Sequence, residues 1–121
     1  RWCRNQVKDP MCQLGAELYH FQSLSHHGVK YQIDDVIEMK GKEYAQIKGI
    51  WAEKDGNLES LRLKLHFLKE IKGETLCGLW KKYQFTSKIQ LMSNWKFLVG
   101  KLFVVERNQN QLTLDPNYYL G

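Results

Sequence analysis

Histidine and cysteine are the side chains of this sequence best suited to hold a transition metal. The chain contains His20, His26, His27, His66, Cys3, Cys12 and Cys77. No Cys-x-x-Cys pair occurs, and the histidine spacings match no common zinc-finger pattern. We therefore expect no metal site and no cofactor, and a domain that folds without metal.

Nucleophilic catalysis would need a cysteine or serine beside a base and an oxyanion-binding segment. Cys77 with a histidine is the available pair, but neither a glycine-rich segment nor a G-x-x-x-x-G-K phosphate loop accompanies it. A small buried thiol is the ordinary role of such a cysteine. We expect no enzymatic activity. Three widely separated cysteines also argue against a disulfide framework and favour a reducing compartment.

Charge is segregated along the chain, whose formal net charge is +5. Residues 31–60 carry four lysines against seven acids, and residues 61–105 carry nine basic residues against two acids. An acidic segment attracts a basic peptide, whereas a basic segment attracts phosphate. Lysines that only solubilise exposed strand faces are the simpler alternative. The candidate nucleic-acid-binding residues are Lys81, Lys82, Lys88, Trp95, Lys96 and Lys101, because aromatic rings between lysines can stack on bases.

Short strands separated by turn signals must position these residues. Leu61, Leu63, Leu65 and Phe67 alternate with mostly polar residues, a period of two that predicts one buried face. The pair Asp55-Gly56 predicts a hairpin. Strands are expected over 18–22, 29–33, 36–39, 44–52, 61–68, 83–92 and 97–105, and turns over 23–28, 40–42 and 115–117.

This order of elements predicts a mainly β fold, a small, partly closed antiparallel β-barrel with short helical turns. We expect an N-terminal extension over 1–17, the β domain over 18–105, and a C-terminal extension over 106–121 that packs on the domain or trails from it. The first residue is Arg and not Met, so we interpret the chain as a fragment of a longer protein, monomeric by itself. No apolar run approaches the roughly 20 residues needed to span a membrane.

Three blocks in order resemble a bromo-adjacent homology (BAH) domain. The first is 28–37, Gly-Val-Lys-Tyr-Gln-Ile-Asp-Asp-Val-Ile, similar to the family's Gly-Asp-Val-Val step with Asp34 in place of glycine. The second is 44–51, Tyr-Ala-Gln-Ile-Lys-Gly-Ile-Trp. The third is Phe85-Thr86-Ser87 leading to 99–104, Val-Gly-Lys-Leu-Phe-Val. The first two blocks are most similar to the chromatin proteins of this family that carry a GATA-type zinc finger.

The resemblance implies a nuclear, non-catalytic module that binds a histone tail or another chromatin-complex subunit, with roles in transcription regulation and gene silencing. BAH domains that read methyl-lysine use an aromatic cage, and the matching positions here hold Glu38 or Met39, His66 and Leu68. His66 replaces an expected Trp and Leu68 an expected Tyr, which removes most of the cage. The rings that could rebuild a cage elsewhere are Trp51, Trp80, Tyr83 and Trp95.

The candidate peptide-binding residues are Asp34, Asp35, Glu38, Trp51, His66 and Leu68. An extended peptide would pair with an exposed strand edge, and the acids would receive its Lys or Arg residues. With the cage replaced, we expect binding to depend only weakly on lysine methylation. The alternatives are direct, weak nucleic-acid binding through the lysine-rich face, and a purely structural scaffold domain.

Overall fold

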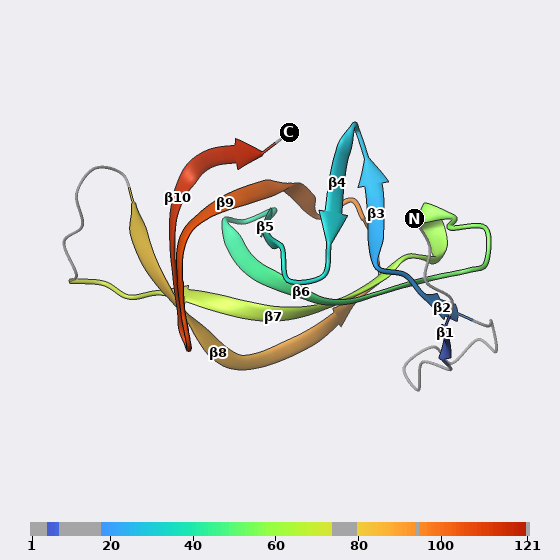
Figure 1. Ribbon diagram of the computed structural model, residues 1–121, viewed down its shortest axis with the longest axis horizontal. Helices are drawn as coiled ribbons and strands as arrows, with labels where there is room; N and C mark the ends of the chain where they lie inside the picture. The colour runs from blue at the N-terminus through green and yellow to red at the C-terminus, as the bar shows by residue number, and fades with distance from the viewer. Residues whose placement is uncertain (1–4, 8–17, 74–79, 94, 121) are drawn as a thin grey trace.

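The structure is a computed structural model that describes residues 5–7, 18–73, 80–93 and 95–120. It is built mainly from antiparallel β-strands, with a single turn of 3-10 helix within these residues (Figure 1). The elements are β1 (Asn5–Val7), β2 (Leu18–His20), β3 (Ser23–His26), β4 (Val29–Gln32), β5 (Val36–Met39), β6 (Glu43–Ala52), η1 (Leu58–Ser60), β7 (Arg62–Glu70), β8 (Lys81–Met92), β9 (Leu98–Asn108) and β10 (Gln111–Leu120). No helix among the described residues is long and apolar enough to cross a membrane.

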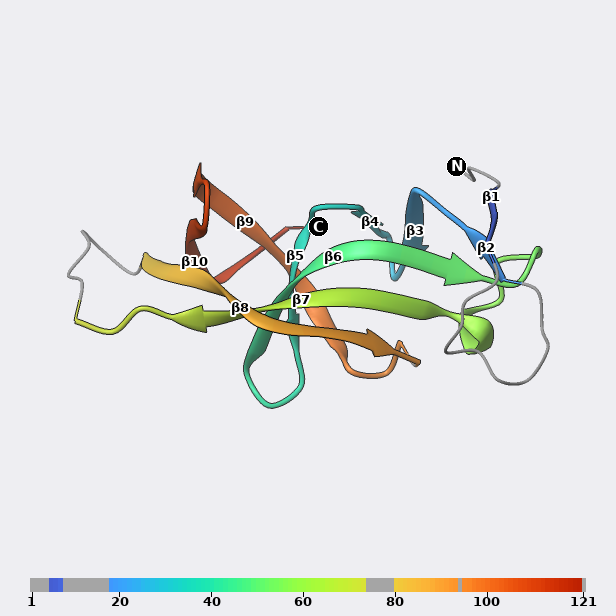
Figure 2. The ribbon, with the colours of Figure 1, turned by 90° about the horizontal axis from the view of Figure 1, so that it is seen from below.

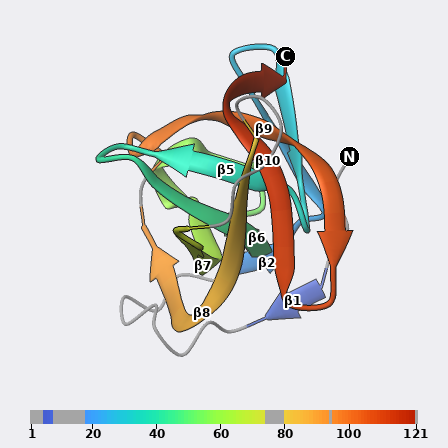
Figure 3. The same ribbon diagram turned by 90° about the vertical axis from the view of Figure 1, so that its left-hand side faces the viewer.

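Six strands close into a barrel, which confirms the predicted fold class. Their order is β6-β5-β9-β10-β8-β7, and pairing of β7 back onto β6 completes the ring. Figure 3 looks into this ring from one end. Figure 2 shows β6, β7 and β8 side by side as one wall, while β1 and β2 extend the sheet beyond β6. Closure gives every barrel strand two partners, which removes the exposed edges of an open sheet.

The alternating run before and along β7 faces the core as predicted. Leu61, Leu63, Leu65 and Phe67 are all buried. Leu68 is buried too, because the register between β7 and β8 shifts between His66 and Leu68. Phe67 packs with the larger apolar cluster and Leu68 with a smaller one that contains Tyr83 and Leu114. The bulge thus divides the core into two parts.

The segment 23–28, predicted as a turn, is mostly strand. Ser23–His26 forms β3, which pairs with β4 in a separate two-stranded sheet, and the turn is only His27-Gly28. Both turn residues have positive φ, 50° and 76°, as the tight hairpin turn compatible with strand twist requires. Serine and histidine gave the segment a polar composition, but its Leu24 is buried.

The C-terminal segment is part of the barrel. Gln111–Leu120 forms β10, which lies between β8 and β9, so the predicted turn at 115–117 is wrong. Leu112 and Leu114 are buried in the smaller cluster. The pairing with β9 shifts register between Leu114 and Tyr119, which lets the strand pass Pro116 without an element break.

Candidate functional site

A pocket of about 270 Å³ opens at the end of the barrel where β7 ends and β8 begins. It is lined by Lys42, Tyr44, Glu70, Lys81, Tyr83 and Pro116. The β5–β6 turn and strands β6, β7, β8 and β10 each supply at least one of these residues. Four separate parts of the chain, at 42–44, 70, 81–83 and 116, therefore form one site, which we call the tyrosine pocket.

Strand register brings the tyrosine pocket together. Tyr44 stands opposite Glu38 on β5 and opposite Leu68 on β7, while Tyr83 stands opposite Glu70. The rings of Tyr44 and Tyr83 lie 5.1 Å apart between centroids at an angle of 57°. Two of the predicted cage positions, Glu38 and Leu68, are thus the immediate neighbours of Tyr44, and the aromatic rings come from β6 and β8.

A buried carboxylate lies behind these rings. Glu38 is only 7% exposed, and the Tyr119 hydroxyl donates a 2.6 Å hydrogen bond to its Oε1. A carboxylate at low exposure requires such a donor, because leaving it unpaired costs more than the bond itself contributes. The same bond, with burial and the charge of Glu38, raises the pKa of Tyr119 to about 12.

Two carboxylates, Glu38 and Glu70, act on both rings of the tyrosine pocket, whose lining also contains Lys42 and Lys81. Burial is the largest cause that raises the pKa of both Tyr44 and Tyr83, and Glu38 and Glu70 raise both further. The phenols therefore remain protonated near neutral pH. Lys81 Nζ lies 3.7 Å from Glu70 Oε1, but both side chains are partly in water, where one pair is weak. Neutral rings beside carboxylates favour a cationic ligand group.

The acidic pair Asp34 and Asp35 lies outside the tyrosine pocket, at the β4–β5 turn. Asp34 Oδ1 is 3.6 Å from Lys48 Nζ, and Asp35 Oδ2 is 3.0 Å from Lys101 Nζ. Asp35 Oδ2 also accepts a 2.7 Å hydrogen bond from the Gln32 amide. Lys101, predicted to contact nucleic acid, therefore forms an ion pair with Asp35, which was predicted to contact peptide. The two side chains bind each other within the domain.

Trp51 and His66 also lie away from the tyrosine pocket. Trp51 is the residue before the last of β6, packs over Gly49 and meets the His20 ring edge-on at 5.2 Å. His66 Nε2 is 2.6 Å from the Thr86 carbonyl oxygen, and its ring stacks on Phe85 at 4.6 Å. The two contacts of His66 join β7 to β8 at the bulge between these strands. Only Glu38 and Leu68 of the six predicted peptide-binding residues adjoin the pocket.

The predicted nucleic-acid-binding residues are spread over several elements. Lys81 and Lys82 begin β8, and Lys88 lies further along it, 4.2 Å above the Phe67 ring. Trp95 and Lys96 lie between β8 and β9. Trp95 packs against the larger core cluster and meets the His26 ring at 4.5 Å. Lys101 is on β9.

The histidines do not gather into a metal site within the described residues. His26 and His27 are neighbours, with ring centroids 3.9 Å apart, and burial and the charge of His27 lower the pKa of His26. Across the described ranges, no group of three or more His, Cys, Asp or Glu could hold a metal ion. Cys3, Cys12 and Cys77 lie outside the described residues.

Sequence reasoning named Tyr83 as a possible cage ring but missed Tyr44 and Glu70. A signal for Tyr44 was present, because it starts the strand after the 40–42 turn, where hairpin register sets it opposite Glu38. Comparison with known protein families, with curated proteins and with solved structures finds no match to this chain.

Proposed function

We propose that this domain is a non-catalytic, chromatin-associated interaction module of the BAH kind, which binds a histone tail or another chromatin-complex subunit. The tyrosine pocket carries the proposal. It combines the half-buried Tyr44 ring with the carboxylates of Glu70 and buried Glu38, so it suits the cationic end of a lysine or arginine side chain.

The positions of the BAH-like blocks support the same proposal. The first block spans β4, the β4–β5 turn and the start of β5, and the second lies within β6. In the third, the Thr86 hydroxyl donates to the Phe67 carbonyl oxygen at 2.9 Å, and the Lys88 amide donates to that hydroxyl at 3.1 Å. The Phe-x-Ser resemblance thus falls on the residues that fix the bulge beside the pocket wall.

We expect lysine methylation to increase the affinity of a peptide for the pocket only weakly. A methyl-lysine cage needs several ring faces around the ammonium group. Here Tyr83 is 3% exposed, so it offers little ring surface, and Leu68 occupies the place of another ring. A carboxylate such as Glu70 attracts an unmodified ammonium group as well, because that group keeps three hydrogen-bond donors.

Titration of this domain with matched unmodified and trimethylated histone-tail peptides tests the proposed function. We expect binding to at least one tail, with a preference for the trimethylated form below about tenfold, or about 1.4 kcal/mol. A larger preference would show a complete cage. Failure to bind any tail would instead favour the scaffold role.

A further inference from the structure

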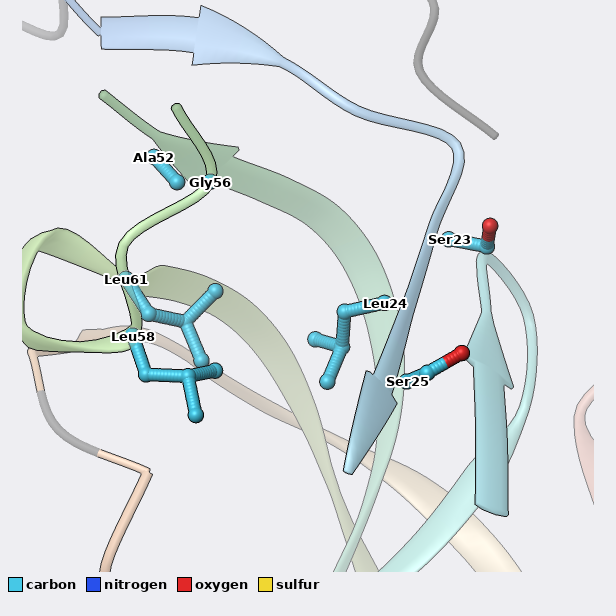
Figure 4. A pocket seen from close by; sticks show the side chains of 7 residues that line it. All are labelled: Ser23, Leu24, Ser25, Ala52, Gly56, Leu58 and Leu61. Atoms are coloured by element: carbon cyan, nitrogen blue, oxygen red, sulfur yellow. The ribbon is translucent and has the colours of Figure 1, made fainter. Parts of the chain in front are cut away.

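A second pocket, of about 300 Å³, lies at the other end of the barrel. It is lined by Ser23, Leu24, Ser25, Ala52, Gly56, Leu58 and Leu61 (Figure 4). Figure 4 shows the Leu24 side chain on the same side as Leu58 and Leu61, while the hydroxyls of Ser23 and Ser25 turn away. Tyr44 and Ala52 are eight residues apart on β6, so the two pockets are separated by roughly 26 Å of strand. The second pocket is therefore a distinct site.

One edge of β3 borders this pocket. β3 pairs only with β4 among the described strands. His26 and Val29 flank the two-residue turn, and further along the hairpin the Ile33 amide donates a hydrogen bond to the Gln22 carbonyl. Hydrogen-bonded pairs alternate along an antiparallel ladder, so residues 22, 24 and 26 direct their backbone groups toward β4. The amide and carbonyl of Ser25 therefore point away from β4. Ser25 is exposed, so this part of the edge is accessible.

The second pocket and the open edge match the two requirements of strand addition. A peptide strand that pairs at Ser25 gains backbone hydrogen bonds, and alternate side chains then point to the face that carries Leu24. That face is the apolar wall of Leu24, Ala52, Leu58 and Leu61. A peptide side chain next to the paired residue would therefore enter the pocket.

The charged residues around the second pocket favour a peptide of opposite charge. Segment 53–59, which runs from the end of β6 into η1, carries Glu53, Asp55 and Glu59 against Lys54. All four side chains are exposed. No ion pair within the described residues involves these acids. An acidic rim beside an apolar pocket is complementary to a strand in which basic and small apolar residues alternate.

We propose that the open edge of β3 and the pocket beside it form a docking site for an extended partner peptide, in which basic residues alternate with small apolar ones. The peptide adds a strand to the β3–β4 sheet, places an apolar side chain between Leu24 and Leu58, and directs lysine or arginine toward the 53–59 acids. This site goes beyond the proposed function, since it does not require the tyrosine pocket.

Ser25→Pro tests the docking site. It removes the amide donor that faces away from β4, so the β3–β4 ladder keeps its hydrogen bonds, and proline is tolerated at such an edge. Ser25→Ala is the matched control, because it removes the hydroxyl and keeps the amide. The probe is a short peptide of alternating Lys and Val, titrated into the isotopically labelled domain, with a Glu–Val peptide for comparison.

The expected result is that the Lys–Val peptide shifts amide resonances of β3 and of 53–61. Affinity should be unchanged in Ser25→Ala and fall by about tenfold or more in Ser25→Pro, provided that the hairpin resonances of both variants remain dispersed. Glu59→Lys offers a second variant that leaves the edge intact and should weaken binding. Any of four results would overturn the proposal. They are equal affinity of the two Ser25 variants, equal binding of the Glu–Val peptide, resonance shifts confined to the tyrosine pocket, and no shifts at millimolar peptide. Loss of histone-tail binding alone would not contradict the proposed docking site.

Discussion

The hydrogen bond from Tyr119 to Glu38 is the residue-scale contact on which the tyrosine pocket depends. Tyr119→Phe removes the donor and leaves a buried carboxylate with one partner fewer. We expect the free energy of unfolding to fall by about 1–2 kcal/mol at neutral pH. Chemical denaturation measures the change, and Tyr19→Phe is the control, because Tyr19 is half-buried away from this pocket.

The same bond makes stability depend on alkaline pH. The pKa of Tyr119 rises from 10.0 to about 12 in the folded protein, so its contribution is fully present below pH 10.0 and is lost as pH rises toward 12. Tyr44 and Tyr83 have raised pKa values and act in the same direction. Unfolding free energy should therefore fall above pH 10.0 in the wild type and less steeply in Tyr119→Phe. Identical slopes would show that the bond is absent in solution.

Individual site residues were harder to predict from the sequence than the fold. Asp34 and Asp35 form a conspicuous acidic pair, but Lys48 and Lys101 come from β6 and β9 to engage them. The sequence shows that two acids are neighbours, but it does not show which lysines from distant strands will pair with them. Glu70 joins the tyrosine pocket only because the register of β7 on β8 sets it opposite Tyr83. That register follows a bulge that no local pattern announces.

At the scale of elements, β7 was predictable and β10 was not. A strict period of two marks β7, because one face is buried and the other meets solvent. β10 contains Asp115-Pro116-Asn117, a strong turn signal by composition. The strand accommodates these residues where its pairing with β9 is irregular. Strand β3 was missed for a similar reason, since only one of its four residues, Leu24, is an apolar core residue.

Leu114→Ala tests whether β10 is a barrel strand. Leu114 is 0% exposed, so truncation leaves a cavity and should cost about 2–5 kcal/mol of unfolding free energy. Val105→Ala on β9 is the control, because Val105 is 37% exposed and its truncation should cost less than about 1 kcal/mol. Similar costs for the two variants would mean that 111–120 only trails from the domain.

At the scale of the whole molecule, the net charge of +5 predicts weak, sequence-independent affinity for DNA. Lys82 and Lys88 on β8 and Lys96 between β8 and β9 are the residues of the predicted basic face chosen for the test. Reversal of these three lysines to glutamate should lower retention on DNA at low salt. Reversal of Lys30, Lys40 and Lys54 changes net charge equally and is the control. Equal retention of the two triple variants, or no change in either, would reject the face.

The tyrosine pocket as the receptor for a peptide lysine is the central claim about the whole domain. Glu70→Gln tests it most directly, because the amide keeps the shape of the side chain and removes its charge. Glu106→Gln makes the same change at an exposed position of β9 that lines neither pocket. The measurement is calorimetric titration of both variants and the wild type with the unmodified histone-tail peptide that binds best. We predict an affinity loss of about tenfold in Glu70→Gln and none in Glu106→Gln. Equal affinities for the wild type and Glu70→Gln would contradict the account.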